Sequence, residues 1–89
     1  INCEKKYEFS SSRLMFWFSF VNEYDYNFLK REIQDKAKYT ESIRENDRPS
    51  IPVYEFIIDS ERKMEFYIKG EIDENFYEIQ MNIYNNKNA

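Results

Sequence analysis

Apolar and polar residues alternate in several stretches of the chain, and this period of two predicts β-strands. The strongest alternation covers residues 13–21, where apolar side chains fall on both faces of the predicted strand. Such a strand is covered on both sides, or has a second face that meets a partner. The other alternating stretches are residues 6–9, 53–59, 63–72 and 76–84. The last three are joined by short polar turns, which predicts an antiparallel meander.

Between the stretches 13–21 and 53–59 the hydrophobic period changes to that of a helix. Apolar or small residues recur at spacings of three or four, at Tyr26, Leu29, Ile33, Ala37 and Thr40. Asn22 precedes this stripe and is a good N-cap, and acidic residues follow it in the first turn. Since no Gly or Pro interrupts the stripe, it predicts a long helix over residues 24–43.

The predicted order is ββαβββ, and it indicates an α+β domain with two layers. One long helix packs on an antiparallel sheet of four to five strands, because each has one apolar face to bury. A chain of 89 residues makes a single domain, 1–89, with 1–5 as an N-terminal tether and 85–89 as a frayed tail. The predicted buried face of the meander includes Tyr54, Phe56, Phe66, Tyr77 and Ile79.

The chain has more aromatic residues than such a core can hold, at 19% of the sequence. Aromatic residues and Met are enriched where proteins meet. We therefore predict a partner-binding surface on the sheet face opposite the helix. Its residues are Met15, Trp17, Tyr67, Phe76 and Tyr84, with the neighbouring acidic residues Glu65 and Glu78. On the strand 13–21, Met15, Trp17 and Val21 need a cover. Strong curvature that folds the meander back, a second copy of the chain or a foreign protein partner could supply it, and one of the last two is expected.

The net charge of −4 comes from residues 51–89, which hold eight acidic and four basic side chains. An acidic surface disfavours nucleic acid and suits a basic protein partner. The exposed aromatic residues Tyr67, Phe76 and Tyr84 could stack bases, but Glu65 and Glu78 beside them would repel phosphates. No transmembrane segment is predicted, because no apolar run approaches the roughly 18 residues that a span needs.

The composition argues against catalysis and against a metal or cofactor site. The chain has no His, one Cys and one Gly, so a zinc site, a cysteine–histidine pair and a glycine-rich phosphate loop are all excluded. The carboxylates Glu55, Glu65 and Glu78 are expected on the outward sheet face, where they form a weak candidate acid–base or cation site. Basic residues share that face, so a solvated mixed-charge row is the better interpretation. Glu71, Asp73 and Glu74 are interpreted as an ordinary turn.

These observations favour a small acidic, non-catalytic protein-binding module of the inhibitor or immunity type, which acts by occluding a protein partner. The alternative is a lipid-tethered domain of the cell envelope, anchored through Cys3 near the N-terminus. The first hypothesis is compatible with a cytoplasmic location and the second requires the envelope.

Overall fold

The computed structural model describes residues 2–10, 12–42, 51–74 and 76–85 of the chain. In order along the chain, its elements are β1 (Glu4–Phe9), β2 (Arg13–Phe20), α1 (Glu23–Lys36), β3 (Lys38–Ser42), β4 (Ile51–Ile57), β5 (Arg62–Asp73) and β6 (Phe76–Asn85). The predicted α+β class is confirmed, with one helix packed on an antiparallel sheet. The predicted strand number and order were incomplete, because the sheet has six strands and β3 follows the helix directly.

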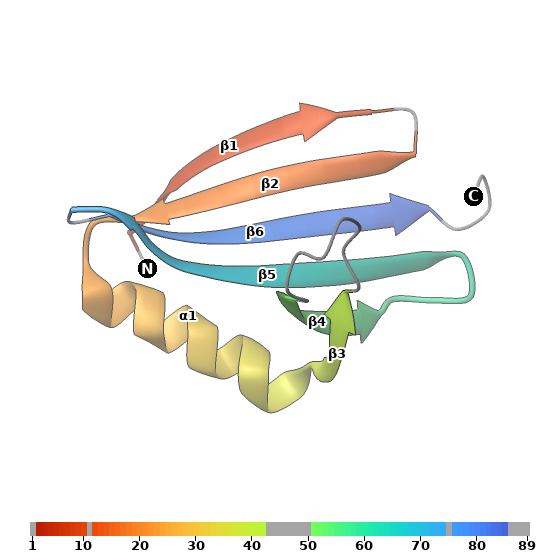
Figure 1. The fold of residues 1–89 in the computed structure, drawn as a ribbon. Helices are drawn as coiled ribbons and strands as arrows, with labels where there is room; N and C mark the ends of the chain where they lie inside the picture. The colour runs from red at the N-terminus through yellow and green to blue at the C-terminus, as the bar shows by residue number, and fades with distance from the viewer. Residues whose placement is uncertain (1, 11, 43–50, 75, 86–89) are drawn as a thin grey trace.

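All six strands pair antiparallel in one sheet with the spatial order β1-β2-β6-β5-β4-β3 (Figure 1). The last strand, β6, therefore lies in the middle, between the N-terminal hairpin and β5. The sheet is strongly twisted, so that β3 and β4 run at a steep angle to β2 and β6 (Figure 1). The two edges of the sheet are β1 and β3.

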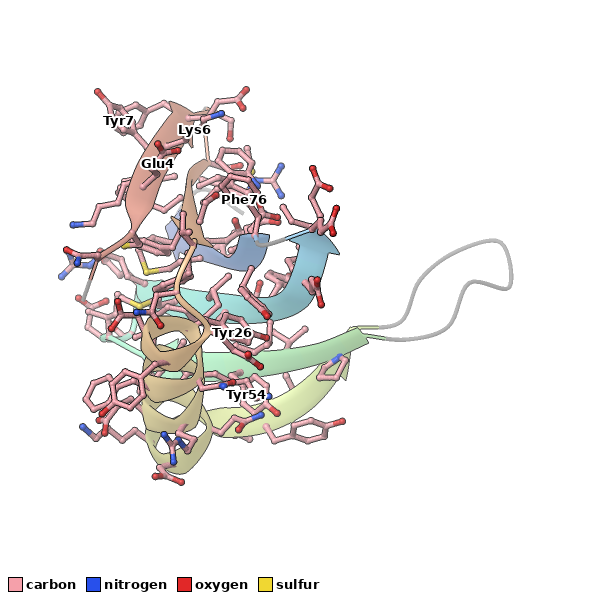
Figure 2. All side chains as sticks on the ribbon, turned by 90° about the vertical axis from the view of Figure 1, so that its left-hand side faces the viewer. Glu4, Lys6, Tyr7, Tyr26, Tyr54 and Phe76 are labelled. Atoms are coloured by element: carbon pink, nitrogen blue, oxygen red, sulfur yellow. The ribbon has the colours of Figure 1, made fainter. Side chains whose placement is uncertain are left out.

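The helix packs on one face of the sheet, which we call the inner face. Four residues form the buried core cluster, each at most 5% exposed: Phe20, Tyr26, Ile33 and Ile79. The Tyr26 ring stacks on that of Tyr77 at 5.0 Å and meets the Phe20 ring edge-on at 6.0 Å. Figure 2 shows Tyr26 on the side of α1 that faces the sheet. Each such side chain stabilises the fold by about 1.5–3 kcal/mol through burial.

The buried face predicted for the meander is correct. Tyr54, Phe56, Phe66 and Tyr77 are half-buried and pack against the core cluster, and Ile79 belongs to it. The strand registers place Phe66 opposite both Tyr54 and Met81, so these side chains share one face. Within the described residues, no helix is long and apolar enough to span a membrane.

The helix begins where the sequence predicts. The Asn22 side chain accepts a hydrogen bond from the backbone N–H of Tyr24 at 2.8 Å, which satisfies one of the unpaired donors of the first turn. Acidic Glu23 and Asp25 occupy that turn, where the helix dipole favours negative charge.

The helix ends earlier than predicted, at Lys36 rather than near residue 43. Ala37 has the extended backbone angles φ −92° and ψ 158°, and its N–H still bonds to the carbonyl of Ile33. The residues after it form β3, which pairs with β4 and brings Tyr39 edge-on to Tyr54 at 5.6 Å. Ala37 and Thr40 continue the helical spacing only by coincidence. With 14 residues the helix is about 21 Å long, shorter than expected.

The one glycine of the chain sits where β5 becomes irregular. The register between β5 and β6 shifts between Ile68 and Gly70, and Gly70 has a positive φ of 77°. This left-handed conformation is easy for glycine and strained for other residues. A side chain at Gly70 would first meet the Tyr26 hydroxyl at 3.9 Å, so space is not the constraint. Gly70 is therefore required for its backbone conformation.

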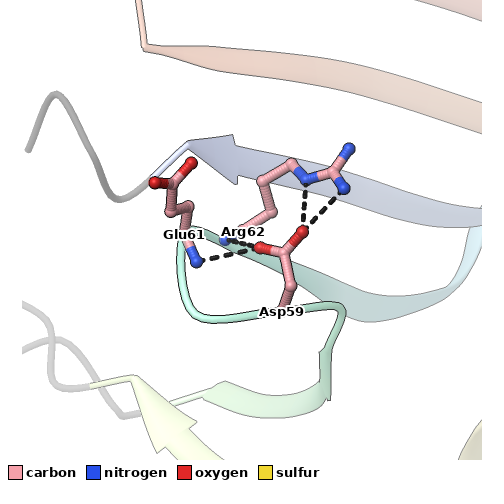
Figure 3. Close-up of polar contacts among 3 residues, drawn as sticks. All are labelled: Asp59, Glu61 and Arg62. Carbon is pink, nitrogen blue, oxygen red and sulfur yellow. Dashed lines mark hydrogen bonds and ion pairs between the residues drawn. The ribbon is translucent and has the colours of Figure 1, made fainter.

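The turn between β4 and β5 is closed by Asp59 (Figure 3). One oxygen of its carboxylate accepts hydrogen bonds from the backbone N–H groups of Glu61 and Arg62, at 2.8 and 2.9 Å. The other oxygen accepts two from the Arg62 guanidinium, at 3.0 and 2.7 Å. These bonds lower the pKa of Asp59 and raise that of Arg62. The hairpin predicted from the short polar connection is thus fixed by its own side chains.

Candidate contact surface

The sheet face opposite α1 carries the candidate surface, and we call it the outer face. Its centre lies on β2, β6 and β5, where the registers place side chains in three neighbouring rows. The rows are Arg13–Tyr84–Lys63, Met15–Asn82–Glu65 and Trp17–Gln80–Tyr67.

Five of the seven predicted contact residues meet in these rows: Met15, Trp17, Tyr67, Tyr84 and Glu65. All five side chains are partly buried rather than fully exposed. The other two, Phe76 and Glu78, lie near the β5–β6 turn, with Phe76 paired to Asp73 and Glu78 to Gly70. All seven residues therefore lie on the three neighbouring strands β2, β6 and β5, but only five of them form one patch.

Hydrogen bonds hold the polar side chains of the patch in place. The Tyr67 hydroxyl donates to Glu65 at 3.1 Å, and the Gln80 amide donates to the Asn82 carbonyl oxygen at 3.0 Å. The Asn82 amide in turn donates to the Tyr84 hydroxyl at 3.3 Å. Asn82 is only 3% exposed although it points away from the helix. Its burial and two side-chain bonds make it the fixed centre of the patch.

A single lysine links the two sides of this network. The Lys63 ammonium lies 3.6 Å from the Glu65 carboxylate and 5.7 Å from the centre of the Tyr84 ring. The Glu65 side chain is 13% exposed, so this ion pair is better shielded from water than a typical surface pair. Burial, followed by the charge of Glu65, raises the pKa of Tyr67 well above its ordinary range. Like any tyrosine it is protonated at neutral pH, so its hydroxyl can donate the hydrogen bond to Glu65.

The carboxylate row that the sequence suggested is only partly formed. Glu55 and Glu65 are direct cross-strand neighbours on β4 and β5. Glu78 lies elsewhere, opposite Ser19 and Gly70, so the three carboxylates do not line up. Among the described residues, no three His, Cys, Asp or Glu side chains are grouped closely enough to hold a metal ion.

Cys3 lies beside the core rather than on a free tether. It is half-buried and packs against the core cluster. The expected tether 1–5 is also shortened, because β1 begins at Glu4. A hollow of about 400 Å³ is lined by Cys3 and five neighbours, Asn2, Glu4, Ser19, Val21 and Asn22. Val21 lies beyond the end of β2 and is 67% exposed, so it is not part of the patch. Lipidation of Cys3 stays a prediction, and no contact of this residue supports it.

Sequence reasoning placed Lys63 and Gln80 on the outward face but did not include them in the contact surface, and it missed Asn82. Alternation along β6 places Gln80 and Asn82 on the outer face, and this signal was available from the sequence. Which residues they lie beside, however, depends on the registers of β2 and β5 against β6: Gln80 is opposite Trp17 and Tyr67, and Asn82 is opposite Met15 and Glu65. Comparisons with protein-family models, curated proteins and solved structures found no match to this chain.

Proposed function

We propose that this protein is a small non-catalytic binding module of the inhibitor or immunity type, which occludes a site on a protein partner through its outer face. The observation that carries the proposal is the patch around Asn82. Trp17, Tyr67 and Tyr84 are large, partly exposed and brought together by three neighbouring strands. Hydrogen bonds fix both tyrosines before binding, so little side-chain freedom is lost on contact.

Charge supports a basic partner. The carboxylates of the β5–β6 turn, Asp73 and Glu74, lie at the same end of the sheet as the start of α1 with Glu23 (Figure 1). Glu23 and Glu71 both raise the pKa of Tyr77, after its burial, which places them around that ring. This acidic end lies around the inner-face ring of Tyr77 rather than in the outer patch, and its negative charge would speed the approach of a positively charged protein.

The proposal involves no catalytic step by this chain. The sequence contains no histidine, and the carboxylate best placed on the outer face, Glu65, is already engaged by Lys63 and Tyr67.

The test begins with the proteins that the parent chain retains from the organism that makes it. Each retained protein is purified, and its affinity for the parent, Trp17→Ala, Tyr67→Ala and Tyr24→Ala is measured by isothermal titration calorimetry. Tyr24 is the matched control, because it is an aromatic residue 69% exposed on the helix, away from the outer face.

We expect Trp17→Ala to weaken binding of the true partner by about 30-fold or more, as for residues that dominate an interface. Tyr67→Ala should weaken it similarly, whereas Tyr24→Ala should change it less than threefold, roughly the scatter for neutral contacts. If every partner binds the Trp17 and Tyr67 variants as tightly as the parent, the outer face is not the contact surface.

A further inference from the structure

The edge strand β1 has side chains and backbone groups suited to pairing with itself. It ends the sheet, so one of its two sides has no strand beside it within the described part of the chain. Its sequence is Glu-Lys-Lys-Tyr-Glu-Phe, and every one of these residues is exposed. Figure 2 shows Glu4, Lys6 and Tyr7 together at the top edge of the sheet.

The backbone groups that face the free side can be identified from the β1–β2 turn. Ser10 N–H donates to the Arg13 carbonyl at 2.9 Å, so these two residues form a hydrogen-bonded pair. Such pairs alternate along an antiparallel ladder. Lys6 opposite Trp17 and Glu8 opposite Met15 are therefore hydrogen-bonded to β2. The N–H and C=O groups of the residues between them, Lys5, Tyr7 and Phe9, consequently point to the free side.

The side chains of the same residues alternate between the two faces of the sheet. Tyr7 and Phe9 lie opposite Phe16 and Leu14 on the inner face, and they are 67% and 72% exposed. Their rings meet edge-on at 6.0 Å. This pair extends the apolar surface of the inner face to the β1 edge of the sheet. That edge lies far from α1 (Figure 1).

We propose that β1 pairs antiparallel with β1 of a second copy of this chain, with Tyr7 opposite Tyr7, to form a symmetric dimer with a continuous sheet. In this register Lys5 of one copy faces Phe9 of the other. About six backbone hydrogen bonds join the copies, two for each opposed pair of Lys5, Tyr7 and Phe9. The two-fold axis is perpendicular to the sheet, so the outer faces of both copies are on the same side.

The charged side chains of β1 favour pairing with a second copy of β1, and they favour this register. With Tyr7 opposite Tyr7, Lys6 of each copy lies opposite Glu8 of the other on the outer face, which gives two favourable ion pairs. Neither Lys6 nor Glu8 forms an ion pair with another described residue of its own chain. Cross-strand pairs of opposite charge stabilise a sheet, and like charges oppose it.

The neighbouring symmetric registers all place like charges together. Centring the pair on Lys6 puts Lys6 against Lys6 and Glu4 against Glu8. Centring it on Glu8 opposes two glutamates. Centring it on Lys5 opposes two lysines, although it also places Glu4 of each copy against Lys6 of the other. Charged residues on an edge strand normally prevent pairing with other chains. In β1 they favour the register centred on Tyr7, which brings two pairs of opposite charge together and opposes no like charges.

The test measures the mass of the protein in solution by sedimentation equilibrium, at concentrations up to millimolar. We expect the parent to dimerise, and Lys6→Glu and Glu8→Lys each to weaken the dimer by about tenfold or more through like-charge repulsion. An equimolar mixture of the two single variants should dimerise again. In that mixture, each altered side chain faces an opposite charge.

Two further variants separate this surface from others. Tyr7→Pro removes an N–H that points to the free side, so it should abolish the dimer while circular dichroism and thermal melting show a retained fold. Tyr67→Ala alters the outer face on β5, three strands from β1, and should leave the dimer intact, which keeps this test independent of the proposed contact surface.

Three results would overturn the proposal. The first is a parent that stays monomeric at millimolar concentration. The second is a dimer that survives both Lys6→Glu and Glu8→Lys, or a mixture of these variants that stays monomeric. The third is a parent that grows into longer polymers, which would indicate pairing of β1 with the other edge, β3, in a head-to-tail manner.

Discussion

Replacing Ile79 with alanine tests the central feature of the fold, the contact between α1 and the middle of the sheet. Ile79 is fully buried on β6, opposite Phe18 on β2 and Ile68 on β5, and it belongs to the core cluster with Ile33 of the helix. The change removes three carbon atoms. Their transfer to water costs about 2.4 kcal/mol, and the cavity left behind raises the loss to about 3–4 kcal/mol.

That loss is large for a domain of this size. By the usual range per residue, the free energy of unfolding is about 4–13 kcal/mol. With a urea dependence of about 1–2 kcal/mol per molar, Ile79→Ala should lower the urea midpoint by about 2 M, or leave the protein unfolded in water. The midpoint is measured by circular dichroism and by fluorescence of Trp17.

The matched control is Ile57→Ala, which makes the same chemical change in β4 at a side chain that is 70% exposed. It should cost no more than about 1 kcal/mol, chiefly from lower strand propensity. If Ile79→Ala and Ile57→Ala shift the midpoint equally, then the helix does not cover Ile79 and the assignment of the two sheet faces is refuted.

Two other substitutions test local features of the hairpins. Gly70→Ala should destabilise the fold by about 1 kcal/mol or more, because residue 70 has a positive φ. Gly70→Asn should cost less, since Asn tolerates that conformation better than Ala. Equal urea midpoints for the parent and Gly70→Ala would contradict this expectation. Asp59→Asn should lower stability at neutral pH. Since the folded pKa of Asp59 is depressed, its contribution is fully present above the unfolded pKa of about 3.9 and is lost as the pH falls through the folded value. Melting temperatures of the parent and Asp59→Asn should therefore converge in acid, and a constant difference down to the lowest pH would show that the ion pair is not its source.

The sequence predicted most strands and their buried face because that information is local. Alternation in residues 63–72 and 76–84 requires only the two-residue period of a strand, and the polar turns between strands force antiparallel neighbours. The N-cap at Asn22 is equally local, because its side chain bonds to the backbone N–H of Tyr24 only two residues further on.

The end of the helix could not be predicted in the same way. Ala37 and Thr40 fit the helical stripe, and no Gly or Pro marks a boundary before them. What decides the conformation of β3 is its pairing with β4, from Lys38 opposite Glu55 to Ser42 opposite Ile51. This pairing connects residues far apart in sequence, so tertiary structure overrides the local pattern.

The candidate surface shows the same limit. Outward residues such as Trp17, Tyr67 and Glu65 were identified by alternation alone. Their grouping around Asn82 follows from the position of β6 between β2 and β5, which no single segment encodes. Phe76 and Glu78 were expected in the same surface, but the length of β6 separates them from Tyr84.

Both proposals concern apolar side chains that the single helix α1 does not cover. A protein partner would cover those on the outer face, and a second copy of the chain would cover those at the β1 edge. Pairing through β1 hides the edge and the rings of Tyr7, but it leaves Trp17 and Tyr84 accessible in both copies. Because its two-fold axis would be perpendicular to the sheet, the proposed dimer would present two outer faces in the same direction. A partner that is itself dimeric or attached to a surface would then meet two contact sites at once, and linking two sites raises the overall affinity without any new contact. A variant that only breaks the dimer should thus weaken capture of a surface-bound partner while leaving its affinity for one soluble partner molecule unchanged.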